Sequence, residues 1–314
     1  MEKNTFPVSA YIAAPLNRVE DYLQDLKNLD EWTLFSRMRE KVDDHTWLGS
    51  ASAYQTSLYY HIRRSSGRPF RGFEWHCGVR RDEYYQVYPT YLFPTDYIEP
   101  GSEEPGTYFH WVSFIDPARC TPMLAQALDP IHLSECRALK SVLEHRAGLT
   151  QPAAGRYSIK TASIYVDAPL DLGASYLGDA RNTEVWTHRL RPRGEVSLEG
   201  GDFVDQYGRT ARVALKTHPQ AGYFIVEHDV LYPDHGVIQR APMLLFPCSY
   251  VFANPEARGF ILHRITFFRN GAPAPCERAS IADFHAENIN AKRLIEASAG
   301  NLGSFARGPS YLSG

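Results

Sequence analysis

The spacing of apolar and polar positions changes several times along the chain, and the changes mark out a distinct order of elements. Residues 6–14 (FPVSAYIAA) alternate like a half-buried strand. Residues 15–26 (PLNRVEDYLQDL) follow a helical spacing after an initial proline, and residues 28–35 (NLDEWTLF) start with an asparagine suited to capping a second short helix. Residues 47–115 are aromatic and β-branched with regular turn signals, which predicts consecutive antiparallel strands. A long helix is expected at residues 122–146.

The same order of elements recurs in the second half of the chain. Pro15 and Trp32 match Pro169 and Trp186, each 154 residues later. Residues 89–97 (PTYLFPTDY) match residues 242–250 (PMLLFPCSY) at a separation of 153, and a second long helix is expected at residues 279–298. Self-similarity over this length indicates a duplicated globular domain.

Two histidine pairs keep the separation of 153 residues. His110 in YFHWVSF matches His263 in ILHRITF, and His132 in PIHLSE matches His285 in DFHAEN. The seam between the copies falls near HRAGLTQPAAGRY, where glycine, proline and alanine interrupt the pattern. We therefore predict two α+β domains, residues 1–150 and 151–314.

The predicted elements imply an architecture with a cavity. In each domain a curved antiparallel sheet would wrap around the long C-terminal helix, as expected for an α+β fold. A sheet that does not close fully against its helix leaves a space between them. A pocket in each domain is therefore expected from the fold alone.

Composition narrows the classes of partner. The formal net charge of −3 at pH 7 gives no broad basic field for nucleic acid and no polybasic membrane signal. No signal peptide or membrane span is apparent, and the five cysteines are scattered without metal-binding spacing, as in a reducing cytoplasm. A cytoplasmic protein with a small-molecule or protein partner is expected.

Several short motifs resemble a known family. They are the Ala-Pro after the first strand, EWTLF at residues 31–35, FEW at 73–75 and GTYFHWVSFID at 106–116. Together with the duplication they resemble the helix-grip superfamily of START and birch-pollen-allergen-like domains (SRPBCC), and within it the di-domain aromatase/cyclases of bacterial polyketide pathways. The resemblance implies two tandem helix-grip domains, cyclisation of a polyketide-like chain, and no redox cofactor.

The resemblance also implies particular site residues. In the family, a pocket arginine follows the "EW" strand motif. The matching position here is Val79, and Arg81 lies two residues further along, on the same face of a strand. Arg81 could instead sit in a turn with Asp82 as a surface ion pair. A strand histidine and pocket aromatics correspond to His110, Trp32 and Trp75.

The chemistry of such a reaction suits these residue types. Cyclisation needs a donor that stabilises an oxyanion, which arginine supplies, and a group that moves protons near pH 7, which histidine supplies. We predict Arg81, His110 and His132 as catalytic residues and His263 and His285 as ligand contacts. The histidines could instead tie strand to helix, or bind a metal with Glu135 and Glu287, although two histidines alone are few ligands for zinc.

Other candidates have both a structural and a functional interpretation. Trp186, Tyr88 and Tyr91 could pack the core or line a pocket for a flat ligand. Residues 188–195 (HRLRPRGE) carry alternating arginines at 189, 191 and 193, expected on a solvated face that an acidic acyl carrier protein could bind.

The two pockets are not expected to be chemically equivalent. Glu227 and His228 stand where the first copy has Glu74 and Trp75. We favour a cofactor-independent cyclase or dehydratase whose chemistry lies in the first copy. A binding protein that sequesters a hydrophobic metabolite and a metal-dependent hydrolase of acylated phenols remain as alternatives.

Overall fold

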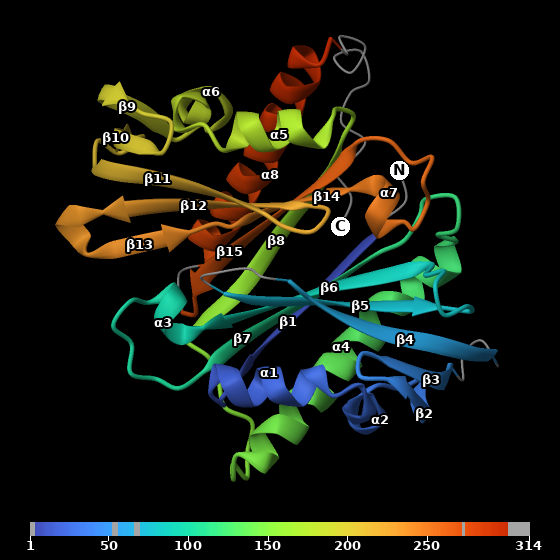
Figure 1. Ribbon diagram of the computed structural model, residues 1–314. Coiled ribbons are helices and arrows are strands. Elements are labelled where there is room, and N and C mark those ends of the chain that lie inside the picture. Colours follow the sequence, from blue (N-terminus) through green and yellow to red (C-terminus); the bar gives the residue numbers. More distant parts are fainter. Residues whose placement is uncertain (1–3, 52–55, 66–69, 272–273, 301–314) are drawn as a thin grey trace. The chain divides into compact units, whose positions relative to one another are not determined.

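The computed structural model describes residues 4–51, 56–65, 70–271 and 274–300 (Figure 1). The chain forms two compact units. The first unit comprises residues 2–159 together with 249–255, and the second comprises residues 160–248 together with 256–314.

The first half of the chain contains a seven-stranded sheet, one long helix and several short helices. Their bounds are β1 (Thr5–Ile12), α1 (Leu16–Gln24), η1 (Leu26–Asn28), α2 (Leu29–Trp32), β2 (Ser36–Asp43), β3 (Thr46–Ala51), β4 (Thr56–Ser65), β5 (Arg71–Gly78), β6 (Gln86–Pro94), α3 (Thr95–Ile98), β7 (Thr107–Phe114) and α4 (Pro122–Arg146).

The second half repeats this order and adds a short 3₁₀ helix and a short strand. Its elements are β8 (Tyr157–Val166), α5 (Leu170–Leu177), η2 (Ala180–Asn182), α6 (Thr183–Trp186), β9 (Leu190–Val196), β10 (Gly200–Asp205), β11 (Thr210–Pro219), β12 (Phe224–Tyr232), η3 (Pro233–His235), β13 (Val237–Arg240), β14 (Met243–Pro247), α7 (Cys248–Val251), β15 (Phe260–Arg269) and α8 (Ala274–Ser298).

The two sheets have the same topology. The first has the strand order β1-β7-β6-β5-β4-β3-β2, and the second has β8-β15-β14-β12-β11-β10-β9, with β13 paired to β12. The paired strands are antiparallel, including β1 with β7 at the sheet edge. This arrangement confirms two α+β domains with antiparallel sheets.

In the first unit, one face of the sheet packs against α4. Side chains alternate between the two faces of a strand, so Phe109 and Trp111 of β7 lie on one face. They share an apolar core with Cys136 and Leu139 of α4. The helix begins as the sequence predicts: the side chain of Thr121 accepts a hydrogen bond from the Leu124 amide, and Pro122 occupies the first turn.

The second unit is built in the same way. Phe260 and Leu262 of β15 share a core with Ala291 and Ile295 of α8. The residues that face the long helix are therefore the even-numbered ones along β15 from Phe260. This alternation decides which predicted site residues reach the interior of each unit.

A few elements differ from the sequence-based predictions. Strand β2 starts at Ser36, earlier than the predicted sheet, and α8 starts at Ala274 instead of residue 279. Asn28 does not cap α2; its side-chain amide donates to the Tyr22 carbonyl, which ties α1 to the following helix. Pro94 closes β6 and is followed at once by α3.

Candidate functional site

The long helices of the two halves correspond at a separation of 152 residues, not 153. On α4, Lys140 pairs with Glu144, which accepts a hydrogen bond from the Ala13 amide. On α8, Lys292 pairs with Glu296, which accepts from the Asp167 amide. The strand histidines His110 and His263 are 153 residues apart, whereas these helix residues are 152 apart. The second half has therefore lost one residue between strand β15 and this part of α8.

This register changes which residues are equivalent. His132 corresponds to Phe284, and Glu135 corresponds to Glu287. All four side chains are buried. The prediction that His132 and His285 are equivalent was therefore wrong. A shift of one residue along a helix rotates the side-chain direction by about 100°. Glu135 and Glu287, by contrast, are a true pair.

Glu287 joins two arginines in the interior of the second unit. Its Oε2 accepts from Arg264 Nη1 at 2.7 Å, and its Oε1 accepts from Arg189 Nε at 3.2 Å. Glu287 is 0% exposed and Arg264 is 2% exposed. Burial alone would raise the pKa of Glu287, but the charges and hydrogen bonds of the two arginines lower it, so the group is a carboxylate.

His228 of β12 lies beside this ion pair network. It is 2% exposed, and neither ring nitrogen has a hydrogen-bond partner among the described residues. Burial, followed by the charge of Arg264, lowers the pKa of His228 to about 3. The ring is therefore neutral near pH 7 and retains one nitrogen that can accept a proton.

Aromatic rings hold the arginine and histidine in place. The Arg264 guanidinium lies 4.1 Å from the Phe284 ring centroid and 5.2 Å from that of Trp186. The ring of Trp186 is also 5.3 Å from that of His228. Such cation–π contacts fix the direction of the guanidinium in an apolar setting.

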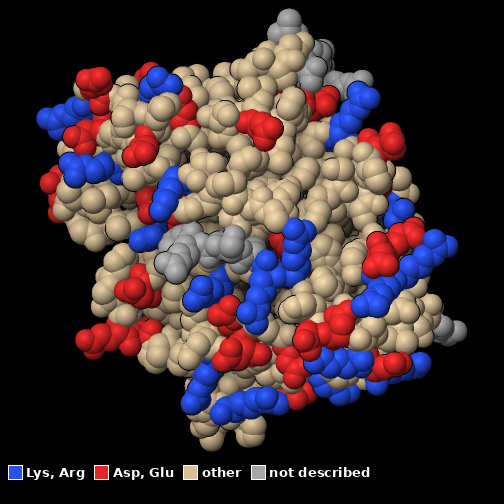
Figure 2. Space-filling model, viewed as in Figure 1, with Lys and Arg blue, Asp and Glu red and all other residues tan. Residues whose placement is uncertain are grey.

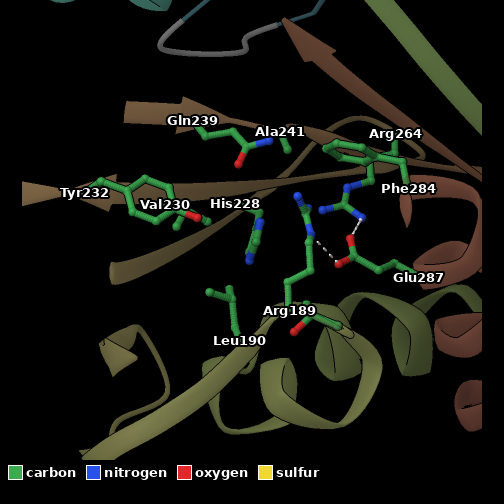
Figure 3. Close-up of a pocket in the computed structure, with 11 residues that line it drawn as sticks. Arg189, Leu190, His228, Val230, Tyr232, Gln239, Ala241, Arg264, Phe284 and Glu287 are labelled. Atoms are coloured by element: carbon green, nitrogen blue, oxygen red, sulfur yellow. Dashed lines mark hydrogen bonds and ion pairs between the residues drawn. The ribbon is translucent and has the colours of Figure 1, made fainter. Parts of the chain in front are cut away.

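These groups line a small cavity (Figure 3). It has a volume of about 10 Å³, counted as the space open to the centre of a water-sized sphere, which is room for about one water molecule. In Figure 3 the Arg189 guanidinium lies between His228 and the Arg264–Glu287 pair. The cavity residues are Thr187, Arg189, Leu190, His228, Val230, Tyr232, Gln239, Ala241, Arg264, Phe284 and Glu287.

One side of the cavity reaches toward solvent. Arg189, Tyr232 and Gln239 are only half-buried, whereas the residues around Glu287 are fully buried. Gln239 belongs to β13, the strand that the second half adds to the common topology. A ligand larger than water would enter between these three side chains.

The first unit fills the equivalent space with aromatic rings. Trp75 stands in place of His228, and Trp111 in place of Arg264. The rings of Trp32, Trp75 and Trp111 have centroids 5.5 to 6.1 Å apart, and the ring of His132 lies 4.5 Å from that of Trp111. Because their rings pack directly against one another, Trp32 and Trp75 are core residues in this structure.

Glu135 marks the difference between the two interiors. In the first unit its Oε1 accepts from the Leu34 amide at 2.8 Å, and no ion pair joins it to a cation among the described residues. Burial raises the pKa of Glu135 to about 7. The same fold thus holds a charged network in one copy and a nearly neutral interior in the other.

Arg81 does not lie where its predicted role requires. It sits in the turn after β5, is exposed, and its Nη2 pairs with Asp43 Oδ2 at 2.7 Å. The strand ends at Gly78, so the alternation that would have placed Arg81 on the strand face does not continue that far. The structure gives Arg81 no access to the interior of the unit.

The strand histidines face away from the long helices. In β7, Phe109 and Trp111 point toward α4, so His110 points to the opposite face, where Ser9 Oγ lies 2.8 Å from its Nδ1. His263 repeats this contact with Ser163 at 2.7 Å. Both histidines link the edge strand to its neighbour, so His110 does not face the helix that carries His132.

The remaining predicted residues divide in a similar way. Tyr88 packs against Trp111 with ring centroids 5.6 Å apart. Tyr91 lies on the other face of β6, against Phe70. His285 is exposed on α8 and does not line the cavity. Of the predicted ligand contacts, Trp186 lies next to two residues that line the cavity, His228 and Arg264.

Arg264 was not among the residues predicted from the sequence, and Arg189 was predicted in the wrong place. Arg264 follows His263 directly in β15, so it lies on the opposite face of the strand. Aligning the copies at 153 would have set Arg264 against Trp111, a charged residue at an apolar core position. Arg189 was expected on a solvated face, but its side chain turns inward while Arg191 and Arg193 are exposed.

The surface adds little that distinguishes a partner. Acidic and basic side chains are interspersed over the face shown in Figure 2. In the part of the chain that the structure describes, no helix is long and apolar enough to cross a membrane, and no group of three or more metal-binding side chains is assembled. Cys77, Cys120, Cys136 and Cys248 are buried, and Cys276 lies outside the described side chains.

The buried histidines predict an acid-sensitive fold. Burial lowers the pKa of His132 to about 4 and those of His228 and His263 to about 3. Below pH 6.5 the unfolded chain binds protons that the native state does not, so the free energy of unfolding falls as pH falls, by about 1.4 kcal/mol per pH unit for each histidine. Urea unfolding between pH 7 and pH 4 measures this slope.

Two carboxyl groups act in the opposite direction. The pKa of Glu135 is raised to about 7 and that of Asp229 to about 6, so the native state holds their protons where the unfolded chain does not. We expect a shallow loss of stability from pH 6.5 to about 4.5 and a steeper one below. In His228→Gln the slope should decrease by about one histidine's share. An unfolding midpoint that does not change with pH would contradict this assignment.

Comparisons with known proteins complete the description of the site. A family model described as "Domain of unknown function (DUF8713)" matches residues 1–152 and 159–304. The chain is similar to the di-domain ARO/CYC StfQ of the steffimycin pathway (14% identity, 94% of this chain and 99% of that chain, TM-score 0.34). It is also similar to a START superfamily protein from Mycobacterium smegmatis (12% identity, 46% of this chain and 99% of that chain, TM-score 0.33). No curated protein matches.

Proposed function

From the premise that the chain belongs to the DUF8713 family, we propose that the second unit is a cofactor-independent cyclase or dehydratase site for a polyketide-like, enolisable carbonyl compound. One observation carries the proposal. Two copies of one fold stand in the same chain, and among the described residues only the second copy has a neutral buried histidine beside a guanidinium network. Exchanging a whole buried ion pair for apolar residues is often neutral for stability, and the first copy has Trp111 in place of Arg264, so the fold does not require the pair.

The residues suit an aldol-type step. A proton passes from the carbon between two carbonyl groups to the free nitrogen of His228, and the C–H electron pair becomes an enolate. The enolate carbon attacks a second carbonyl carbon, forming the C–C bond, while the alkoxide oxygen takes hydrogen bonds from Arg189 or Arg264. The alkoxide then takes the proton back from His228. Loss of hydroxide and a further proton as water completes dehydration.

The electrostatics of the site favour this proton transfer only when the ligand is bound. With the cavity as it stands, burial and Arg264 keep His228 neutral. An enolate beside the ring supplies a negative charge that stabilises the imidazolium. The histidine therefore becomes a stronger base as the substrate becomes an anion.

As it stands the cavity has room for about one water molecule, so binding of the reacting part of a substrate requires the half-buried side chains of Arg189, Tyr232 and Gln239 to move outward. The remainder of the molecule would extend past these three side chains. The exposed Arg191 and Arg193 follow Arg189 closely in the sequence. Docking of an acidic acyl carrier protein on these two arginines stays a prediction.

The proposal is tested with thioester mimics of short poly-β-carbonyl chains, followed by mass spectrometry. Aldol cyclisation leaves the mass unchanged and dehydration removes one water. His228→Asn should lower the rate by about 10²- to 10⁴-fold, the usual contribution of a general base. Arg81→Ala serves as the matched control and should keep the full rate.

Two outcomes would overturn the assignment. Loss of turnover in Arg81→Ala with full turnover in His228→Asn would return the chemistry to the first unit. Binding of the mimics without any conversion would support the alternative of a protein that sequesters its ligand.

A further inference from the structure

We propose that the cavity of the second unit binds its ligand as a planar monoanion carrying two oxygen atoms, a carboxylate or the enolate of a 1,3-dicarbonyl compound. The inference rests on the location of the proposed function but not on turnover. It follows from the charges and the hydrogen-bond donors that surround the cavity.

The buried network carries an excess of positive charge. Arg189 and Arg264 contribute two positive charges, and the Glu287 carboxylate contributes one negative charge. His228 is neutral, so the group has a net charge of +1. Buried charges in proteins are normally compensated, and the missing charge here is one anion.

Neighbouring carboxylates do not supply that charge. Asp205 is engaged by Arg209, with Arg209 Nη2 and Asp205 Oδ2 2.6 Å apart. Asp229 neighbours His228 in β12, so its side chain points to the opposite face of the sheet, toward Arg240. Asp283 is half-buried on α8 and adds to the field at Arg189, but no ion pair between them is formed in the described structure.

The free polar groups at the cavity are mainly donors. Arg264 Nε and Thr187 Oγ1 are buried without a hydrogen-bond partner among the described residues. Among the described residues, Arg189 donates only through its Nε, to Glu287, which leaves the edge formed by its two terminal nitrogens available for a two-oxygen acceptor. A ligand with several acceptor atoms and a negative charge complements such a set.

The first unit shows that this donor set is not a requirement of the fold. The positions of Arg189, His228 and Arg264 are taken there by Phe35, Trp75 and Trp111, none of which is charged. The glutamate is kept, but without a cation its pKa is raised to about 7. The anion site is therefore specific to the second copy.

The test uses benzoate and benzamide as probes of equal shape and different charge, with binding followed by calorimetry on the full chain. We expect benzoate to bind and benzamide to bind at least tenfold more weakly. Arg264→Gln should weaken benzoate at least tenfold, while the surface control Arg71→Gln leaves it unchanged. Equal affinity for benzoate and benzamide would overturn the proposal.

Two further readouts separate an anion site from a structural arginine. Glu287→Gln raises the net charge of the network, so benzoate should bind more tightly even though the unit becomes less stable. Benzoate should also shift the NMR signals of the His228 ring at pH 7, where the fold is stable and the probe is ionised. Unchanged His228 signals together with weaker benzoate binding in Glu287→Gln would contradict the anion site.

Acetylacetone distinguishes the two sources of the anion. If the site takes an enolate, acetylacetone binding should fall at least tenfold in His228→Asn, because the histidine accepts the proton. Benzoate arrives already ionised and should not depend on that proton transfer. If benzoate binds but neither acetylacetone nor the thioester mimics do, the anion site stands as a carboxylate site and the proposed cyclase function fails.

Discussion

Replacing Glu287 with alanine should lower the free energy of unfolding by about 3–5 kcal/mol. The substitution removes the carboxylate that accepts from Arg264 and Arg189, and Arg264 then remains in the interior with its charge uncompensated. Removing one member of a buried ion pair costs far more than exchanging the whole pair for apolar residues. Urea unfolding at pH 7 measures the difference.

Glu135→Ala is the matched control for this result. Glu135 occupies the equivalent position on α4, but among the described residues it is hydrogen-bonded only to the Leu34 amide, so its loss should cost about 1–3 kcal/mol. The double variant Arg264→Met with Glu287→Leu should recover most of the stability lost in Glu287→Ala. If Glu287→Ala and Glu135→Ala cost the same, the two arginines are not held by this carboxylate.

Grafting the first interior onto the second should give a folded protein that no longer binds anions. The variant combines Arg189→Phe, His228→Trp, Arg264→Trp and Phe284→His. Larger rings cost about 1–3 kcal/mol where they overfill the space, and removal of the desolvated charges offsets a similar amount. Thermal unfolding should therefore change little, while benzoate binding and conversion of the thioester mimics are lost.

The outcome has to be separated from simple misfolding. A dispersed NMR spectrum and a cooperative thermal transition show that the grafted chain folds. If it does not, His228→Phe with Arg264→Met makes the same test with smaller changes of volume. Full affinity for benzoate in either folded variant would place the anion site elsewhere in the chain.

Much of the fold follows from periodicity. The alternation in β1, the turn signals between strands and the cap at Thr121 are local signals, and the predicted helix at residues 122–146 is found with these bounds. The duplication was visible because Pro15, Trp32 and their partners lie at structurally fixed places. Elements whose limits depend on tertiary pairing, such as β2 and the start of α8, were placed less well.

The site was harder to derive because it depends on which face each residue occupies. His110 and His132 were correctly placed on a strand and a helix, but the alternation of β7 sends His110 away from the helix. His285 is also a histidine, but it lies on the exposed face of α8, whereas His132 lies on the buried face of α4. Arg81 required the strand to continue past Gly78, whereas RRDE at residues 80–83 is a turn signal and the structure places Arg81 in that turn.

The unequal interiors have a consequence for how the chain can tolerate sequence change. In the first copy, Trp32, Trp75 and Trp111 fill space, so substitutions there should be selected by volume and by loss of stability. In the second copy, Arg264 and Glu287 are constrained by charge and direction, so a substitution that keeps volume can still abolish ligand binding. In natural variants of this chain, the three tryptophan positions of the first copy should therefore change to other apolar residues. In the second copy, Arg264 and Glu287 should either both remain charged or both be replaced.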